Sequence, residues 1–394
     1  MNAFSRRAGS LRPSITSEML RYAADPSFIN FGAASPGADF IPDGILRDIT
    51  DELLTNNPAA SLGYTLPEGF RPLRDAIKDR LYSKGILSWN DDDLLITSGA
   101  QQAVDIISRL ICNEGDAVIC PDPCPAELFN TFNAYGARIV SVICDGEGMD
   151  ISSLEKALND NPRTAFIYIN PDYSDPTGIT LSEERRKQVL EAAYRHNVLI
   201  IEDGSYSELG YAGDEMPSIR SLDKKGNVIY VGGFSAVVST GLSVGYICCG
   251  KNIYSRAVCA LEGASLGADS FAQRVIHRLL TRYSYDEYLD ELREKYRKKS
   301  DFLLNCLKYK MPYSVEFTEP YGGFFLWGRV PDGDLNYFCR KVLENKVIMI
   351  PGNAFAIDSP SARLSFRLSC ASVSDEEIEK GTDIIASIAK TLYK

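Results

Sequence analysis

Short apolar runs alternate with amphipathic stretches along the chain from residue 92 onward, and this alternation constrains the fold more than any other feature. Short apolar runs bounded by turn residues predict buried strands, whereas apolar residues that recur every three or four positions predict helices. Strands that alternate with helices indicate βα units and a largely parallel sheet, so an α/β fold is predicted. About seven strands are predicted, at Leu94–Thr97, Ala117–Cys120, Ile139–Ile143, Thr164–Asn170, Val198–Glu202, Val228–Gly232 and Val244–Cys248.

Helices are predicted between these strands, and two of them begin with a recognisable signal. A serine followed three residues later by glutamate forms a capping box, in which each side chain bonds the backbone N–H of the other residue. Ser152 with Glu155 and Ser374 with Glu377 fit this pattern. The predicted helices are Gln101–Cys112, Ala126–Tyr135, Ser152–Leu158, Glu183–His196 and a final helix that begins after Ser374.

The character of the chain changes after residue 250, where long amphipathic helices replace the alternation. Tyr285–Leu307 is the longest of them, and we expect it to connect two domains. A smaller α+β domain is predicted from the strands that follow. These strands lie near Gly323–Trp327, Val347–Ile350 and Arg363–Leu368. We expect residues 46–290 to form the large domain, and residues 1–45 with 291–394 the small one.

Composition and charge argue against several classes of partner. The 394 residues include 42 Lys and Arg against 53 Asp and Glu, a net charge of −11, with the two signs interspersed. No basic patch favours nucleic acid or an anionic membrane, and no apolar run approaches the roughly 18 residues that span a bilayer. The 10 cysteines and 2 histidines show no zinc-binding spacing. No apolar signal segment follows Met1, so we expect reduced thiols and a cytoplasmic protein without a metal site.

Five separated segments place glycine, hydroxyl, tyrosine and charged residues at the ends of predicted elements. They are Ser61–Phe70, Thr97–Ala103, Ile200–Tyr206, Gly233–Tyr246 and Ala362–Phe366. These segments resemble five motifs of class I/II aminotransferases, in the same order along the chain. The motifs are the L-x-Y-G-x-x-x-G-Y segment, the phosphate turn, the D-x-x-Y strand end, the F-S-K-x-x-x-P-G-L-R-x-G-Y loop and the R-L-S-F strand. The resemblance covers nearly the whole chain and is closest to the branch of 2-aminoadipate and kynurenine aminotransferases and MocR effector domains. It implies the fold type I of pyridoxal-phosphate (PLP) enzymes.

The resemblance implies that the turn at Ser98, Gly99, Ala100 and Gln101 holds the PLP phosphate. Physical chemistry supports this placement, because a helix start presents unpaired N–H donors and a partial positive charge. A turn after a core strand also lies where ligands bind, at the carboxyl end of a sheet. A simple helix cap is the alternative interpretation of the same residues.

Further cofactor contacts are implied by the resemblance at Asp203, Tyr206, Ser235 and Tyr64. In the family the aspartate bonds the pyridine nitrogen and the D-x-x-Y tyrosine bonds the phenolic oxygen of PLP. The tyrosine that matches Tyr64 reaches the phosphate of a neighbouring subunit, so a homodimer is expected. A carboxylate that caps a loop, and a turn tyrosine without a ligand, are the alternatives.

An arginine in the last segment is the candidate for binding a substrate carboxylate, because a planar guanidinium meets a carboxylate through two hydrogen bonds. The resemblance to R-L-S-F places this role on Arg363. Arg367 lies on the same face of the predicted strand, so which arginine points inward stays open. A surface ion pair is the alternative for either residue.

The largest departure from the family lies in the Gly233–Tyr246 loop, at Ala236 and Ser243. The family's Schiff-base lysine falls on Ala236, and a methyl group can neither form an imine nor move a proton. The phosphate-binding arginine falls on Ser243, which removes a charge-assisted bond of roughly 1.5–3 kcal/mol. The neighbouring lysines lie outside this loop. Covalent binding of PLP is therefore predicted to be absent.

Three further positions depart from the family pattern. Pro125 falls near the aromatic residue that stacks on the pyridine ring, Asp175 replaces the asparagine of N-P-T-G, and Thr240 replaces the loop proline. An engineered replacement would explain Ala236 alone. The additional changes favour a natural loss of covalent PLP catalysis.

Three functions of different classes follow from these residues. The first is a pseudoenzyme that binds an amino acid, a keto acid or another small anion through Arg363 and the Ser98–Gln101 turn, as a homodimer or paired with an active relative. The second is an enzyme that uses Tyr206, Asp203 or Asp175 as acid or base without a lysine, or that binds PLP or its amine form reversibly. The third is ordinary PLP-dependent transamination, which requires a lysine from elsewhere.

Overall fold

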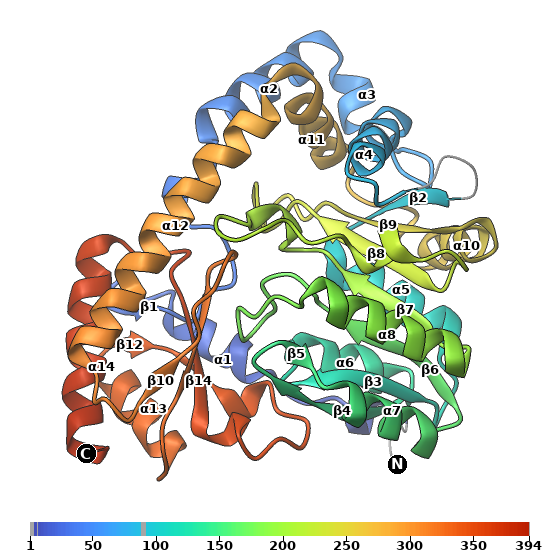
Figure 1. Cartoon of the computed structure of the whole chain (residues 1–394). Helices are drawn as coiled ribbons and strands as arrows, with labels where there is room; N and C mark the ends of the chain where they lie inside the picture. Colours follow the sequence, from blue (N-terminus) through green and yellow to red (C-terminus); the bar gives the residue numbers. More distant parts are fainter. Residues whose placement is uncertain (1–3, 6, 88–91, 394) are drawn as a thin grey trace.

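The computed structural model describes residues 4, 5, 7–87 and 92–393. Within the described residues the main sheet has eight strands, in the order β2-β9-β8-β7-β6-β3-β4-β5 (Figure 1). Strands β8, β7, β6, β3 and β4 run parallel to one another, whereas β9 is antiparallel to both β2 and β8, and β5 is antiparallel to β4. Their bounds are β2 (Asp92–Thr97), β3 (Ala117–Asp122), β4 (Arg138–Asp145), β5 (Gly148–Met149), β6 (Thr164–Ile169), β7 (Leu199–Asp203), β8 (Val228–Gly233) and β9 (Gly245–Gly250). The predicted α/β fold with a largely parallel sheet is confirmed, and β5 is an unpredicted edge strand of two residues.

Helices cover both faces of this sheet. Successive strand residues point to opposite sides, and the side chains on both sides are apolar and must be buried. Phe166 of β6 packs with α5, α6 and α10, while Ile167 packs with α7 and α8 on the other face. Both faces of the central strands are thus buried, and the strands read as continuous apolar runs. The helices are α5 (Gly99–Ile111), α6 (Glu127–Ala134), α7 (Ile151–Asp160), α8 (Glu183–His196), α9 (Ile219–Leu222) and α10 (Lys251–Ser265).

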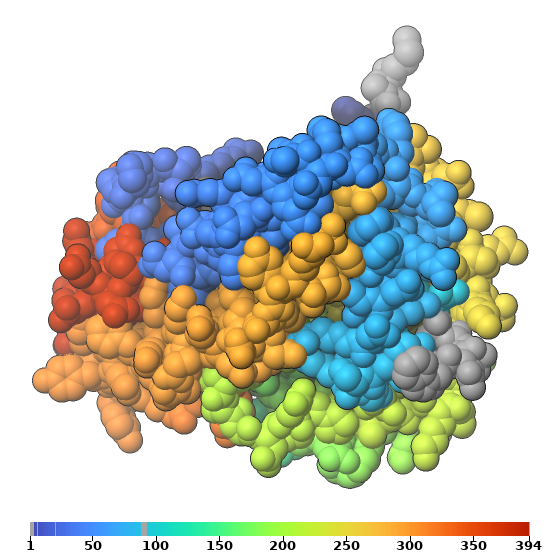
Figure 2. Space-filling view, turned by 90° about the horizontal axis from the view of Figure 1, so that it is seen from above, coloured from blue at the N-terminus to red at the C-terminus, as the bar shows by residue number. Residues whose placement is uncertain are grey.

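A helical layer lies beyond the β2 edge of the sheet and continues into the long helix α12 (Figure 1). Seen from above, the N-terminal helices in blue lie beside α11 and α12 in orange, and α2 contacts α11 directly (Figure 2). Helix α12 runs from the large sheet to the C-terminal part, with Tyr285 buried near one end and Leu307 near the other. The bounds are α1 (Ile15–Tyr22), α2 (Asp43–Asn56), α3 (Pro58–Leu62), α4 (Arg71–Ser83), α11 (Ser270–Arg282) and α12 (Tyr285–Lys310).

The C-terminal part has its own sheet, in the order β10-β11-β14-β13, flanked by two helices. Strand β1 near the N-terminus pairs in parallel with β12, so the N-terminal segment joins this part of the molecule. The predicted capping box of Ser374 and Glu377 is present at the start of α14. The bounds are β1 (Ile29–Asn30), β10 (Glu316–Phe317), β11 (Phe325–Arg329), α13 (Leu335–Glu344), β12 (Val347–Ile348), β13 (Ile350–Pro351), β14 (Ser365–Ser369) and α14 (Asp375–Leu392).

The residue predicted to cap the start of α7 is wrong. Asp150, not Ser152, caps this helix, and its carboxylate accepts a hydrogen bond from the Ser153 N–H at 2.7 Å. Aspartate and serine are both good N-caps, so a serine two residues inside the helix offers a competing pattern. Among the described residues, no helix combines the length and apolarity that a membrane span requires.

A buried carboxylate ties the small sheet to the large one. Asp122, at the carboxyl end of β3, accepts hydrogen bonds from three successive backbone N–H groups of the loop before β14. The donors are Ile357 at 3.2 Å, Asp358 at 2.7 Å and Ser359 at 2.8 Å. Hydrogen bonds to an ionised acceptor are about twice as strong as neutral ones, so this contact holds the loop against the sheet.

The loop that follows β6 is held by Arg186, a fully buried arginine of α8. Its guanidinium pairs with Asp172 and donates to the carbonyl oxygens of Leu181 at 3.0 Å, Pro217 at 3.1 Å and Pro171 at 3.2 Å. A buried charge is tolerated only when it is paired and hydrogen-bonded in this way. Arg186 therefore determines the path of the loop that carries Asp175 to the candidate site.

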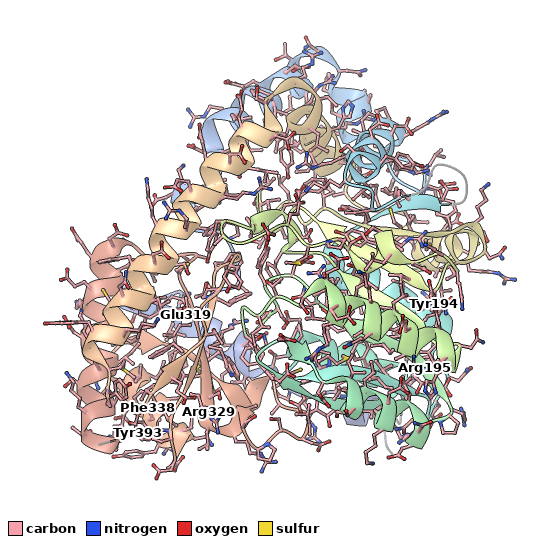
Figure 3. The ribbon with its side chains drawn as sticks, in the orientation of Figure 1. Tyr194, Arg195, Glu319, Arg329, Phe338 and Tyr393 are labelled. Atoms are coloured by element: carbon pink, nitrogen blue, oxygen red, sulfur yellow. The ribbon has the colours of Figure 1, made fainter. Side chains whose placement is uncertain are left out.

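Replacing Arg186 by methionine should lower the free energy of unfolding by about 3–5 kcal/mol, because it leaves a buried carboxylate and three carbonyls without their partner. Urea unfolding followed by circular dichroism measures this loss. Arg195 is the matched control, since it lies on the same helix with its side chain 55% exposed and paired with Glu155 (Figure 3). R195M should cost less than about 1 kcal/mol, and similar losses in both variants would contradict the role given to Arg186.

Candidate functional site

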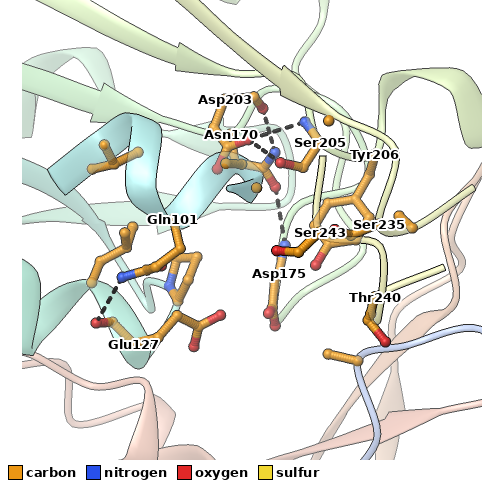
Figure 4. Close-up of a pocket in the computed structure, with 18 of the residues that line it drawn as sticks. Gln101, Glu127, Asn170, Asp175, Asp203, Ser205, Tyr206, Ser235, Thr240 and Ser243 are labelled. Carbon is orange, nitrogen blue, oxygen red and sulfur yellow. Dashed lines mark hydrogen bonds between the residues drawn. The ribbon is translucent and has the colours of Figure 1, made fainter. Parts of the chain in front are cut away.

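A cavity of about 280 Å³ lies at the carboxyl ends of β6, β7 and β8 (Figure 4). This is the position at which ligands bind in open α/β sheets. The wall is formed by the β2–α5 turn, the start of α6 and the loops after the three strands. Its residues are Ala34, Ser98, Gly99, Ala100, Gln101, Val104, Pro125, Glu127, Leu128, Tyr168, Asn170, Asp175, Asp203, Ser205, Tyr206, Gly233, Ser235, Ala236, Thr240 and Ser243.

Asp203, at the end of β7, has a complete set of hydrogen bonds. Its carboxylate accepts from the Tyr168 hydroxyl at 2.7 Å, and from the backbone N–H and the hydroxyl of Ser205 at 3.0 and 2.5 Å. Burial raises the pKa of this carboxyl, while the donors Ser205 and Tyr168 act in the opposite direction. The sequence-predicted pair Asp203 and Tyr206 is thus brought to one wall of the cavity.

Asn170 connects two parts of the site and is not among the residues predicted from sequence. Its amide donates to the Asp203 carbonyl at 2.6 Å and accepts from the Asp175 N–H at 3.1 Å. A polar residue directly after a buried strand is the signal that could have identified it, since Asp203 follows the same rule on the neighbouring strand. Asn170 holds the Asp175 loop against the end of β7.

Asp175 is paired with Arg367, and both side chains are buried. The Arg367 guanidinium contacts the Asp175 carboxylate at 2.6 Å and donates to the Gly32 carbonyl at 2.9 Å. It also lies over the rings of Phe325 and Phe355, at 4.6 and 4.8 Å from their centroids. The single arginine at this end of the site is therefore already neutralised by a carboxylate of the chain itself.

The candidate carboxylate ligand Arg363 lies elsewhere. It is exposed in a 3-10 turn, Ala362–Leu364, and does not line the cavity, whereas Arg367 in β14 points inward. The placement of Arg363 in the site is thus wrong, and the choice that the sequence left open falls on Arg367. The triplet Arg-Leu-Ser occurs twice, at 363–365 and 367–369, and the phenylalanine of R-L-S-F follows only the first, so the full motif pointed to Arg363.

The start of α5 presents the predicted Ser98–Gln101 turn to the cavity. In the described structure the Ser98 side chain does not cap this helix, so the N–H groups of its first turn lack that partner. The turn packs tightly on β9, where a Cβ atom at Gly245 would lie 2.4 Å from the Gly99 carbonyl carbon. Glycine at position 245 is what allows this close approach.

Ala236 and Ser243 both line the cavity, together with Ser235 and Thr240 from the same loop. Ala236 is 6% exposed and packs with the apolar core around it. Ser243 has a positive φ of 44°, and its hydroxyl lies against the start of α5. Pro125 also lies on the wall.

Tyr64 does not reach this cavity within one chain. Its side chain is 94% exposed in the turn after α3 and is absent from the described cavity wall. A contact between Tyr64 and a ligand therefore requires a second copy of the chain, as the resemblance implies.

Glu127, at the start of α6, is a second site residue that the sequence did not reveal. Its side chain lines the cavity and is exposed to solvent there. Burial, followed by the charge of Asp175, raises the pKa of Glu127 to about 7. A lone glutamate in an amphipathic helix has no sequence signature of function, so only the fold identifies it.

The hydroxyl of Tyr206 faces the same space, and its ring packs edge-on against Phe324 and Phe325. Burial, and then the charge of Asp175, raise the pKa of this hydroxyl well above its usual range. Tyr206 therefore acts as a proton donor in hydrogen bonds at neutral pH. Among the described residues, no three His, Cys, Asp or Glu side chains are grouped so that they could hold a metal ion.

The family model described as aminotransferase class I and II matches residues 42–385. The chain belongs to this family. Its relatives include aromatic-amino-acid aminotransferase 1 of Thermococcus litoralis, which is 29% identical over 99% of this chain and 95% of its own length. The 2-aminoadipate transaminase of Thermus thermophilus is also 29% identical, over 99% of this chain and 97% of its own.

A solved structure extends this similarity to three dimensions. The kynurenine aminotransferase of Pyrococcus horikoshii, in complex with PMP, has a TM-score of 0.92 and is 31% identical, covering 99% of this chain and 97% of that one. The HTH-type transcriptional regulator YdfD of Bacillus subtilis is 27% identical over 96% of this chain and 77% of its own length. The predicted family, its branch and the fold type I architecture are thus confirmed.

Replacing Glu127 by glutamine should stabilise this aminotransferase-family protein above neutral pH. A carboxyl whose pKa in the folded protein lies near 7 lowers the free energy of unfolding as the pH rises from about 4.5 to 7. The loss of stability stays constant above pH 7. We expect the melting temperature to rise by roughly 1–3 °C at pH 8 and by less at pH 5, because solvent in the cavity screens part of the effect.

Differential scanning calorimetry at the two pH values measures the change. Glu147, with a 65% exposed side chain, is the control, and E147Q should produce no comparable gain. A pH-independent effect of E127Q would show that the pKa of Glu127 is not raised in the folded protein.

Proposed function

We propose that this member of the family binds a small molecule in its pocket without a covalent bond to PLP, and that it carries out no ordinary transamination. The observation that supports this is Ala236, whose methyl group forms part of the cavity wall in the loop that resembles the Schiff-base loop. Among the described residues, the wall contains neither lysine nor arginine. The amine that bonds PLP in the family therefore has no counterpart in the pocket.

The charges of the pocket support the same proposal. PLP carries a phosphate dianion, and the start of α5 offers N–H donors for it. Ser243 supplies only a hydroxyl beside that turn, while Glu127 and Asp175 face the same space in addition to Asp203, which matches the family's own aspartate. Like charges at short range in a partly closed cavity repel the dianion. These residues do not fit PLP held as in the family.

A second candidate is an enzyme that uses the pocket without a lysine. Glu127 supports it, because a general base works best with a pKa near the operating pH, and burial brings this carboxyl to about 7. Tyr206 could donate a hydrogen bond to an oxygen on the same substrate, and PLP or PMP bound reversibly is a form of the same candidate. Ordinary transamination is supported by the names of the relatives, at 29–31% identity over nearly the whole chain.

Titration with PLP, followed by borohydride reduction and intact mass measurement, separates these candidates. We expect no stoichiometric phosphopyridoxyl adduct on the natural protein, and a single adduct on the A236K/S243R variant, since it regains both the amine and the phosphate charge. A236K alone should capture PLP at least about tenfold more weakly than the double variant.

A single stoichiometric adduct on the natural protein would overturn the proposal in favour of transamination, and keto-acid formation from amino acids would confirm that outcome. Saturable spectral change without an adduct would favour reversible binding of the cofactor. Efficient capture by A236K alone would contradict the importance given to Ser243.

We further propose that two copies of the chain form a dimer through the surface around Tyr64. Leu62 and Leu66 flank Tyr64 and are 68% and 69% exposed. Leu266 is 60% exposed, and its neighbour Gly267 would bring a Cβ atom to 3.7 Å from the Leu66 carbonyl. Neighbouring exposed apolar residues indicate a protein contact. A mixed dimer with an active relative is the alternative.

Light scattering after size exclusion should give twice the mass of one chain for the natural protein. Leu66→Glu places a charge in the proposed interface, so we expect dissociation to increase by about tenfold or more. Tyr313→Glu changes another fully exposed aromatic residue, in the C-terminal part, and should leave the mass unchanged. A monomeric natural protein would refute the dimer.

A further inference from the structure

A second cavity lies where the loops after β6 and β7 meet α12. Its volume is about 360 Å³, which falls within the roughly 300–1,000 Å³ of small-molecule pockets. The wall includes Tyr173 from the first loop, Gly210–Glu215 from the second, and Arg293 of α12. It shares no residue with the wall of the candidate-site cavity. A ligand can therefore occupy this second cavity independently of the first.

Tyr173 is a nearly buried residue of this wall, with 8% of its surface exposed. Its ring fills a slot between glycines of the loop after β7 and of the segment before β11. A Cβ atom at Gly210 would lie 2.1 Å from the Tyr173 hydroxyl oxygen, and one at Gly322 would lie 2.5 Å from the ring. The absence of these Cβ atoms leaves room for the ring. The hydroxyl is thus held against Gly210, on the cavity wall.

The Tyr173 hydroxyl has no hydrogen-bond partner among the described residues, although the backbone N–H of the same residue donates to the Thr180 hydroxyl at 3.3 Å. Burial, followed by the charge of Asp172, raises the pKa of Tyr173 to about 12. The hydroxyl therefore keeps its proton at neutral pH, and its oxygen stays free to accept a hydrogen bond. Because polar groups of nearly buried side chains are normally paired, a free acceptor on a cavity wall points to a group that enters the cavity.

The backbone of Tyr173 is a second sign of a ligand site. Its φ is +50°, in the left-handed region that aromatic residues rarely adopt. Strain of this kind persists only where the surrounding structure imposes it, and it is concentrated at ligand-binding and switch segments. Tyr173 also lies two residues before Asp175 on the same loop. The second cavity is therefore joined through this loop to the candidate site.

The second cavity carries a negative charge. The carboxylates of α12 on its wall are paired with arginines of the same helix. Asp214 and Glu215, in contrast, form no ion pair or hydrogen bond with another residue of the described chain. Both are exposed, so solvent satisfies them and the folded protein needs no ligand there. Their contribution is the sign of the charge that an incoming ligand meets.

We infer that the second cavity binds a small organic cation of the guanidinium class, which donates a hydrogen bond to the Tyr173 hydroxyl and faces Asp214 and Glu215. A guanidinium is planar and carries several N–H donors, so one edge can meet carboxylates while another meets a single acceptor. Tyr211 adds an aromatic ring to the wall, and guanidinium groups stack on such rings. This site is independent of the proposed function, because the two cavities have separate walls.

Anions and metal ions match the cavity less well. Arg293 is the cation on the described part of the wall, and it is engaged by Asp290 at 2.8 Å and by the Glu208 carbonyl at 2.9 Å. No described group of three acidic, His or Cys side chains is placed to hold a metal. Metals bound by oxygen require several ligands around one point. An organic cation matches both the free acceptor and the charge.

Three probes with the same butyl chain test this site by calorimetric titration of the full-length protein at constant ionic strength. Butylguanidinium is a cation with N–H donors, butylurea is its neutral planar counterpart, and butyltrimethylammonium is a cation without N–H donors. We expect butylguanidinium to bind at least about tenfold more tightly than butylurea and at least about threefold more tightly than butyltrimethylammonium. Only butylguanidinium offers both the charge and the hydrogen bond.

Hydrogen exchange measured by mass spectrometry locates the bound cation. Butylguanidinium should slow exchange in peptides that cover residues 172–179 and 207–215, because it holds the two loops together. Peptides that cover residues 98–104, at the start of α5, should exchange as before. Slower exchange at 98–104 alone would place the cation in the candidate-site cavity and would overturn the second site.

Two variants make the test specific. Y173F removes only the hydroxyl, so it should fold and lose the preference for butylguanidinium over butyltrimethylammonium. D214N/E215Q should weaken the binding of both cations by about fivefold or more and leave butylurea unaffected. The control E376Q/E379Q removes two exposed carboxylates of α14, an equal change in net charge, and should bind all three probes like the natural protein.

Binding of butylurea as tight as that of butylguanidinium, no saturable binding of butylguanidinium, or undiminished binding of both cations to D214N/E215Q would each overturn the inference. An unchanged preference between the two cations in Y173F would overturn the hydrogen bond to Tyr173. None of these measurements involves PLP. Failure here therefore leaves the proposed function intact, and a stoichiometric PLP adduct would leave the second site intact.

Discussion

The buried ion pair of Arg367 and Asp175 is the contact on which the site depends. It joins β14 of the small sheet to the loop after β6 of the large sheet, and Arg367 also holds the Gly32 carbonyl of the N-terminal segment. Phe325 and Phe355 pack on the guanidinium from the C-terminal part. A buried charge of this kind is stable only when every partner is in place. Three distant stretches of sequence must therefore converge before the cavity has its shape.

Much of the fold could be predicted from periodicity alone. The bounds of α8 agree with the sequence prediction, because Ser182 caps one end and Asn197 ends the other in a left-handed conformation. Central strands such as β6 were found because both of their faces are buried and apolar. Strand β5 was missed, since two residues carry no periodic signal. Local patterns thus predict the long elements well and the edges poorly.

The site could be predicted only where a short motif identifies it. Asp203 and Ala236 follow strands at positions that the family resemblance marks, and both lie on the cavity wall. Arg363 was chosen over Arg367 because only Arg363 begins the full R-L-S-F motif, although the same triplet recurs four residues later. Glu127 and Asn170 belong to the site through tertiary contacts that no local pattern encodes. The chemical character of the pocket therefore becomes visible only in the fold. The described wall holds three acidic residues and no lysine or arginine, whereas the family resemblance predicts one of each.

The Arg367–Asp175 pair also has a consequence for how quickly a ligand can enter and leave. Because the pair links the large and small sheets within the chain itself, the two sides of the cavity are held together before any ligand arrives. A preformed cavity lowers the entropy lost on association and removes a conformational step from the encounter. We therefore expect a ligand to enter and leave without a slow closure of the two sheets on each other.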